Sequence, residues 1–127
     1  MFESMSKNKA LMRRIYEEMW NLSDPSIAVE IFERPEGVER FVSQFLRAFP
    51  DLQHTIEGMI EEDAHVVVQF SAHGIHKGQW LQYPPTGRSI HYTGVTVAQI
   101  EGDKVVKHHT WWDKLGLVEQ ILTEPIP

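Results

Sequence analysis

The spacing of the apolar residues changes once along the chain, at Pro50, and this change limits the folds that the chain can adopt. Before Pro50 the spacing is helical. It is clearest in Val38–Phe49, where apolar residues stand at i, i+3, i+4, i+7, i+8 and i+11. After Pro50 the residues favour strands, which are separated by turn-forming clusters. Helices followed by strands in hairpin order predict an α+β fold with a mostly antiparallel sheet.

Cap and turn signals divide the chain into elements. Ser6 can cap a first helix whose apolar stripe runs over Leu11–Trp20, and Asp24-Pro25 supplies the cap and first residue of a short second helix. The third helix is Val38–Phe49, which Pro50 ends. The predicted strands are Leu52–Ile60, His65–His76, Ser89–Ile100 and Val105–Trp112, and a last helix spans Leu115–Leu122. Because long strands curl, we expect a cone-shaped barrel in which the sheet wraps around the N-terminal helices and encloses a pocket.

Composition supports a single domain over residues 1–127 and excludes several kinds of site. There is no cysteine, which excludes disulfides and thiolate metal sites and fits a reducing cytoplasm. The seven histidines show no clustered spacing, so no metal is expected. A formal charge of -6 without a basic stripe argues against a nucleic-acid partner. No apolar run approaches the roughly 18 residues of a membrane helix.

The C-terminal run 104–120, which contains Trp111, Trp112 and Asp113, resembles the signature end of the SnoaL-like polyketide cyclases. Those proteins belong to the nuclear transport factor 2-like superfamily of cone-shaped α+β barrels. Three other stretches agree with the family in the same order along the chain: Met12–Asn21, Arg47–Leu52 and Pro84–Arg88.

The resemblance implies an enzyme of the lyase or isomerase class that works without metal or cofactor. It would abstract a proton from a small hydrophobic carbonyl compound and carry out an aldol-type cyclisation or an isomerisation. The alternative is a non-catalytic module on the same fold, which binds a hydrophobic ligand or mediates dimerisation. The resemblance also implies a homodimer through the outer sheet face. Epoxide hydrolysis, known on this fold, usually needs arginines at the site, and Arg88 is the single arginine among the predicted strands.

The chain departs from the family at two places. Family members usually carry a further stretch between the second and third helices, whereas here Ile31–Glu33 runs almost directly into Arg34–Gly37. Part of the usual pocket wall is therefore expected to be missing. In addition, His109 stands where the family often has tryptophan.

Asp113 is the leading catalytic candidate, and two roles are open for it. The resemblance assigns an acid/base role to this aspartate, and the neighbouring Trp111 and Trp112 would desolvate its carboxylate and make it a better base. Its position directly before Lys114-Leu115-Gly116 equally suits a helix cap. The local sequence favours the cap, and the resemblance favours the base.

Two polar residues are expected to assist Asp113 by holding the oxyanion that forms during catalysis. His109 shares strand parity with Asp113. Gln99 matches a polar, pocket-lining position of the cyclases, so the face of Ser89–Ile100 that carries His91 and Gln99 is expected to line the pocket. The residues expected to contact the substrate are Tyr16, Trp20, His76, Trp80, His91 and Trp111.

Overall fold

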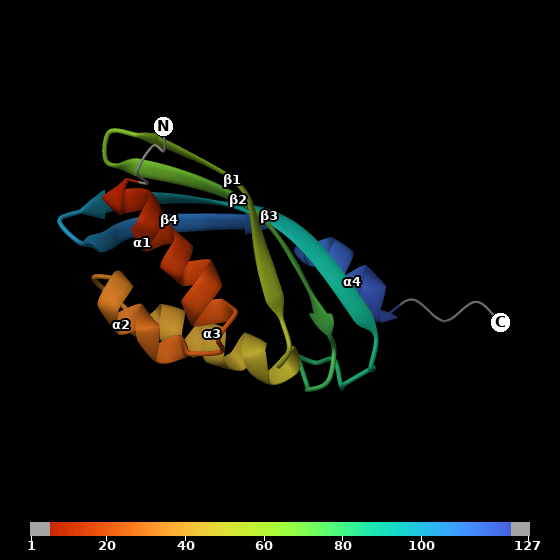
Figure 1. The fold of residues 1–127 in the computed structure, drawn as a ribbon. Helices are drawn as coiled ribbons and strands as arrows, with labels where there is room; N and C mark the ends of the chain where they lie inside the picture. Colours follow the sequence, from red (N-terminus) through yellow and green to blue (C-terminus); the bar gives the residue numbers. More distant parts are fainter. Residues whose placement is uncertain (1–5, 123–127) are drawn as a thin grey trace.

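The computed structural model describes residues 6–122, in which a four-stranded antiparallel sheet curves over a layer of helices (Figure 1). The helical segments are α1 (Lys7–Arg14), η1 (Ile15–Trp20), η2 (Pro25–Ile27), α2 (Ala28–Ile31), α3 (Glu36–Ala48) and α4 (Lys114–Leu122). The strands are β1 (Gln53–Glu62), β2 (His65–Ile75), β3 (Ser89–Glu101) and β4 (Lys104–Trp112). Helices precede strands as predicted, and the predicted α+β fold is confirmed.

The local signals at the helix ends act as predicted. The Ser6 hydroxyl accepts a hydrogen bond from the Lys9 amide at 3.0 Å and so caps α1. The Asp24 carboxylate accepts one from the Ser26 amide at 3.2 Å, at the start of η2. The third helix, α3, ends just before Pro50. The helix boundaries are therefore set largely by local sequence.

The sheet has the strand order β1-β2-β3-β4, and each neighbouring pair is antiparallel. The chain turns into β4 at Gly102, whose φ of 61° is a left-handed conformation that glycine adopts without strain. The register shifts between Ile56 and Gly58, where β1 has the extra residue, and opposite Gln99 and Ile100, where β4 has it; such bulges add bend and twist. The sheet therefore curves, with α1, α2 and α3 on its concave side and α4 against β3 (Figure 1).

The core lies between the concave face of the sheet and the helices. The largest fully buried side chains come from both layers and include Met12, Met19, Ile31, Phe49, Leu52, Val66 and Val68. Since each layer has an apolar face of its own, neither is stable without the other, and burial of these side chains supplies most of the driving force for folding.

Gly94 allows the ring of Phe70 to lie close against β3. A Cβ at this position would stand 2.5 Å from Phe70 Cζ and 2.8 Å from the Trp111 carbonyl oxygen. Gly94→Ala is therefore expected to lower the free energy of unfolding by about 1–3 kcal/mol, measured by urea denaturation. Gly58→Ala is the matched strand control, because its Cβ would meet its nearest neighbour at 4.0 Å. Equal losses in the two variants would contradict the packing argument.

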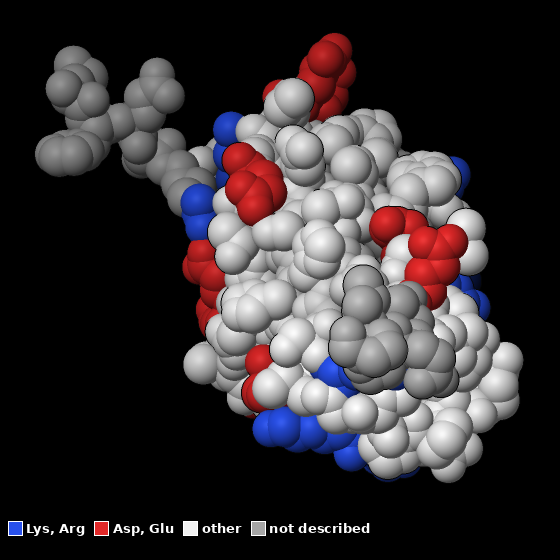
Figure 2. Space-filling model, turned by 90° about the vertical axis from the view of Figure 1, so that its right-hand side faces the viewer, with Lys and Arg blue, Asp and Glu red and all other residues white. Residues whose placement is uncertain are grey.

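Charged side chains are dispersed over the end of the molecule at which α4 lies. On the face drawn in Figure 2, acidic and basic residues are scattered among uncharged ones, and no broad field of one sign forms there. Among the helices of residues 6–122, none is long and apolar enough to cross a membrane.

Candidate functional site

A cavity of about 560 Å³ lies between the concave face of the sheet and the helices beneath it. Its wall is mostly apolar and aromatic, with contributions from Met12, Trp20, Phe41, Phe45, Phe70 and Trp112 among others. The polar or charged residues that line it are Tyr16, Arg34, His54, Tyr92, Thr96, His108, His109 and Thr110. An apolar cavity of this size with a few polar groups is typical of small-molecule sites.

The first helical stretch changes from α to π geometry where it meets the cavity. In η1 the helix widens, so the Asn21 amide donates to the Tyr16 carbonyl at 3.0 Å, five residues back. Such π segments are rare and occur frequently at functional sites. The segment places Tyr16, Met19 and Trp20 on the cavity wall. Sequence periodicity predicted these residues on one helical stripe but did not predict the π winding.

Asn21, at the end of η1, fixes the neighbouring backbone of β1. Its side-chain amide donates to the His54 carbonyl at 2.9 Å, and its side-chain oxygen accepts from the His54 amide at 2.7 Å. This pair of hydrogen bonds holds the backbone of His54 in one position against the π segment.

His54 is a buried imidazole on the cavity wall. The centroid of its ring lies 5.6 Å from that of Tyr16, 5.0 Å from that of Trp20 and 5.5 Å from that of Phe70. Its Nε2 stands 3.4 Å from the Tyr92 hydroxyl, and its Nδ1 has no hydrogen-bond partner among the described residues. The ring is therefore packed on apolar neighbours while its hydrogen-bonding capacity is largely unused.

Burial controls the protonation of His54. It lowers the pKa of the imidazole from 6.5 to about 3, and the charge of His73 adds a smaller effect in the same direction. The ring is neutral at neutral pH, and a neutral imidazole has one nitrogen that can accept a proton.

Two phenols complete the polar part of the cavity. The Tyr16 hydroxyl donates to Thr96 Oγ1 at 2.6 Å, and Thr96 Oγ1 lies 2.7 Å from Thr110 Oγ1. Burial raises the pKa of Tyr16 to about 12, although its bond to Thr96 opposes the shift. Burial likewise raises the pKa of Tyr92, and the nearby Tyr16 adds to that rise. Both phenols stay protonated, so Tyr92 can donate a hydrogen bond to a ligand oxygen.

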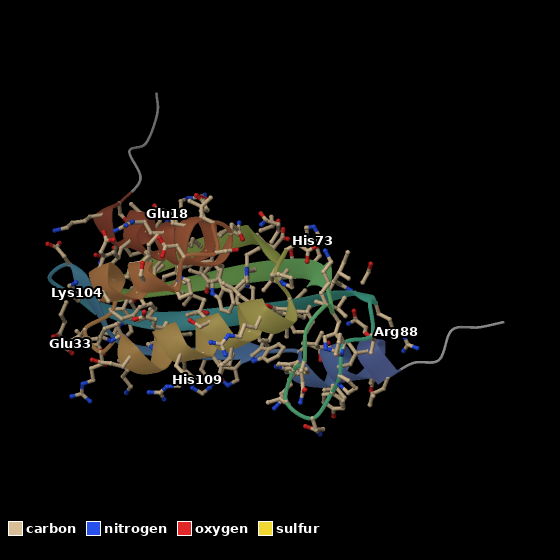
Figure 3. The ribbon with its side chains drawn as sticks, turned by 90° about the horizontal axis from the view of Figure 1, so that it is seen from below. Glu18, Glu33, His73, Arg88, Lys104 and His109 are labelled. Atoms are coloured by element: carbon tan, nitrogen blue, oxygen red, sulfur yellow. The ribbon has the colours of Figure 1, made fainter. Side chains whose placement is uncertain are left out.

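The cavity opens between the start of α3 and the edge strand β4. Phe41 lines the cavity yet is 51% exposed, and the lining residues 108–110 of β4 are exposed as well. Figure 3 shows Glu33 and His109 on this side of the molecule. Apart from a bridge between Phe32 and Val105, this edge of β4 pairs with no other described strand. The opening lies where the short connection to α3 predicted a missing wall.

Asp113 lies at the start of α4, outside the cavity. Its Oδ1 accepts a hydrogen bond from the Gly116 amide at 2.9 Å, and a side chain at Gly116 would collide with the carboxylate. The Asp113 amide donates to the Thr93 carbonyl at 3.1 Å. The residue borders a separate open hollow of about 320 Å³, together with Thr93 and Trp111. Of the two roles that the sequence left open, these contacts support the helix cap.

Two substitutions at Asp113 separate a cap from an acid/base. Asparagine caps helices about as well as aspartate, whereas alanine does not. We expect Asp113→Ala to lower the free energy of unfolding by about 1 kcal/mol, and Asp113→Asn to change it by only a few tenths. Thermal and urea denaturation measure both. If Asp113→Asn instead keeps the fold and abolishes activity, the carboxylate has the acid/base role that the resemblance implies.

The face of β3 that lines the cavity is opposite to the expected one, which corrects the prediction. Tyr92 and Thr96 line the cavity, whereas Gln99 is half-buried outside the cavity lining and donates to the Glu101 carboxylate at 3.3 Å. The backbone of His91 bonds to the side chain of Gln120 at the outer edge. The physical reason is that the other face carries the larger apolar side chains, and the strand turns that face inward: Ile90, Tyr92, Ala98 and Ile100 are all buried.

The other predicted residues divide between the cavity and its surroundings. Tyr16 and Trp20 line the cavity, and His109 borders its mouth. The ring centroid of His109 lies 4.1 Å from that of Trp111, a side chain that is 58% exposed. His76 is fully buried outside the cavity, where its Nδ1 accepts from the Thr86 amide at 3.3 Å. Trp80 is also buried outside the cavity lining, against rings that include Phe45, Phe49 and Trp112. Trp111, expected to contact the substrate, borders the separate hollow beside Asp113 instead. A homodimer through the outer sheet face remains a prediction.

Sequence reasoning did not place His54, Tyr92 or Thr96 in the pocket. One signal could have identified His54: it stands between Leu52 and Ile56 at alternating positions, as a polar residue on an apolar strand face. Within residues 6–122, no group of three His, Cys, Asp or Glu side chains is placed to hold a metal ion.

Comparison with known proteins places the chain in a family. The family described as SnoaL-like polyketide cyclase matches residues 10–121. Similar solved structures include a proposed polyketide cyclase from Acidithiobacillus ferrooxidans, with 22% identity, a TM-score of 0.84, and coverage of 94% of this chain and 97% of that one. A proposed SnoaL-like polyketide cyclase from Jannaschia sp. CCS1 has 21% identity and a TM-score of 0.85, with coverage of 98% of this chain and 100% of that one. A proposed hydroxylase from Streptomyces galilaeus has 23% identity and a TM-score of 0.84, with coverage of 98% of this chain and 87% of that one.

At these identities the solved structures establish the fold alone. No curated protein matches the chain significantly. The family match covers most of the sequence, and the cavity and curved sheet are those of the cone-shaped fold. The chain belongs to the SnoaL-like polyketide cyclase family.

Proposed function

We propose that the chain binds a small hydrophobic carbonyl compound in the aromatic cavity and transfers a proton on it, with His54 as the base. The observation that carries the proposal is the neutral imidazole of His54, buried among aromatic rings with Nδ1 unpaired and Nε2 in a long contact. A titratable group buried in an apolar cavity is a candidate for acid/base chemistry.

The proposed step begins at the carbon beside the substrate carbonyl. His54 takes a proton from that carbon, and the electron pair of the broken C–H bond moves into an enolate. The enolate oxygen accepts a hydrogen bond from the Tyr92 hydroxyl. In a cyclisation, the enolate carbon attacks a second carbonyl of the same molecule and the imidazolium returns its proton to the new alkoxide. In an isomerisation, the proton returns to a different carbon.

The low pKa of His54 applies when no negative charge lies beside the protonated ring. Burial disfavours that isolated charge, but the enolate forms beside the ring and carries the opposite charge. An opposite charge within about 4–6 Å favours the protonated form. The same apolar wall that weakens the base in the empty cavity therefore strengthens the ion pair that forms during the reaction.

The second candidate function is ligand binding without turnover. Two observations favour it: the Asp113 carboxylate, which the resemblance nominated, contacts a backbone amide outside the cavity, and the cavity is open beside β4. An open mouth admits water, which weakens electrostatic stabilisation of a charged intermediate.

Proton exchange distinguishes the two functions without knowledge of the natural substrate. 1-Tetralone is a small bicyclic ketone whose protons beside the carbonyl exchange slowly in D₂O and are followed by NMR. We expect the wild-type protein to bind it and to accelerate this exchange catalytically. Binding without acceleration would support the non-catalytic module, and absence of both would contradict the proposed ligand class.

A further inference from the structure

The side chains that line the cavity include several bases but no carboxylate. Of the titratable acids and bases that line it, Arg34, His54, His108 and His109 are basic, and no aspartate, glutamate or lysine lines it. The chain as a whole has 18 acidic and 12 basic residues. A cavity without carboxylates in an acidic protein is a local reversal of the overall charge, and charge complementarity is a guide to the ligand.

Arg34 is the permanent cation of this set. Of the two arginines in α1, Arg13 pairs with Glu17, and Arg14 pairs with both Glu18 and Glu30. Arg34 forms no ion pair with any carboxylate of residues 6–122, although Glu33 precedes it directly in the chain. Its guanidinium is therefore available to an anion from outside the protein.

Arg34 and His108 belong to the mouth rather than to the depth of the cavity. Both are exposed to solvent, and the His108 ring lies 4.9 Å from that of Phe32, at the end of α2. His54 and Tyr16 are buried at 7% and 3% exposure. The site therefore has an apolar interior and a basic rim, which is an arrangement that orients an amphiphilic molecule with its charge outward.

We propose that the ligand is a hydrophobic carboxylic acid, whose apolar body sits among the aromatic rings while its carboxylate meets Arg34 and His108 at the mouth. This inference rests on the proposed function, because it names the class of ligand for the same cavity. A carboxylate at the rim keeps part of its hydration and gains a charge-assisted hydrogen bond, whereas at His54 it would lose its water to an aromatic wall.

A matched pair of probes tests the inference: 2-naphthoate and its neutral counterpart 2-naphthamide, titrated into the whole protein by calorimetry. We expect the wild type to bind naphthoate roughly tenfold more tightly than naphthamide. Arg34→Gln should remove that preference by weakening naphthoate alone. Arg40→Gln is the control, because Arg40 is an exposed residue of α3 outside the cavity lining, and it should leave the preference intact.

The possible failures are distinguishable. If both probes bind equally well to the wild type, the acid preference is overturned and the apolar binding site stands. If Arg34→Gln retains the preference, the assignment of Arg34 is overturned. If neither probe binds, the inference and the proposed ligand class fail together. A preference for naphthoate without exchange of 1-tetralone would uphold the ligand class and contradict only the proposed catalysis.

Discussion

Replacing His54 with glutamine is expected to slow the catalysed proton exchange of 1-tetralone by roughly 10²- to 10⁴-fold, the range typical of a lost general base. Glutamine keeps a polar side chain of similar reach but has no nitrogen that takes up a proton near neutral pH. The side chain it replaces is buried and lines the cavity. Exchange rates are read by NMR as the loss of the proton signals beside the carbonyl.

The control for this variant is His65→Gln. His65 is an exposed histidine at the start of β2 and does not line the cavity, so its removal should leave the exchange rate unchanged. Calorimetric binding of 1-tetralone to each variant shows whether the cavity is intact. A His54→Gln protein that binds the ketone and exchanges its protons at the wild-type rate would show that another group is the base.

The second large effect concerns stability at acidic pH. The pKa of His54 is about 3 in the folded protein, against 6.5 for an ordinary histidine. Because the folded pKa is lowered, the unfolded state binds the proton first as the pH falls. The stability contributed by neutral His54 is therefore fully present above about pH 6.5 and is lost progressively below it, at about 1.4 kcal/mol per pH unit.

Urea denaturation at pH 7 and pH 4.5 measures this loss. Between about pH 6.5 and 4.5, His54 alone accounts for about 3 kcal/mol. Burial also lowers the pKa of His76, and this group acts in the same direction. The difference between wild type and His54→Gln isolates the contribution of His54. Parallel pH profiles for the two proteins would contradict the burial of a neutral imidazole.

The fold was predictable from sequence because its signals are local. The stripe of Val38–Phe49 and the stop at Pro50 correspond to α3, and the predicted strand Ser89–Ile100 matches β3 to within one residue. The π winding of η1 was not predictable from periodicity. The segment ends at Asn21, whose side chain bonds to the backbone of His54, 33 residues away, and a contact at that separation has no periodic signal in the sequence.

The site was predictable only in part, because it depends on which strand face turns inward. Each strand has two faces, and either face can line the cavity. For β3 the sequence prediction chose the face that carries the polar residue Gln99. The apolar area of the opposite face decided the outcome instead, which brought Tyr92 and Thr96 into the cavity. The alternation of side chains along a strand does not predict the direction of Asp113 either, because β4 ends at Trp112 and α4 begins at Lys114.

Under the proposed function, the family resemblance and the chemistry rest on different residues. The run 104–120, which contains Asp113, carries the resemblance to the family in sequence, yet the Asp113 carboxylate caps α4. Arg34 and His108 lie at the open mouth of the cavity, beside the short connection before α3.

The central claim, that the chemistry belongs to His54 in the cavity and not to Asp113, is tested most directly by measuring 1-tetralone exchange for His54→Gln and Asp113→Asn side by side with the wild type. The account predicts that His54→Gln loses at least roughly a hundredfold in rate, while Asp113→Asn retains both its fold and its rate. Loss of exchange in a folded Asp113→Asn protein, with the rate of His54→Gln unchanged, would contradict the account.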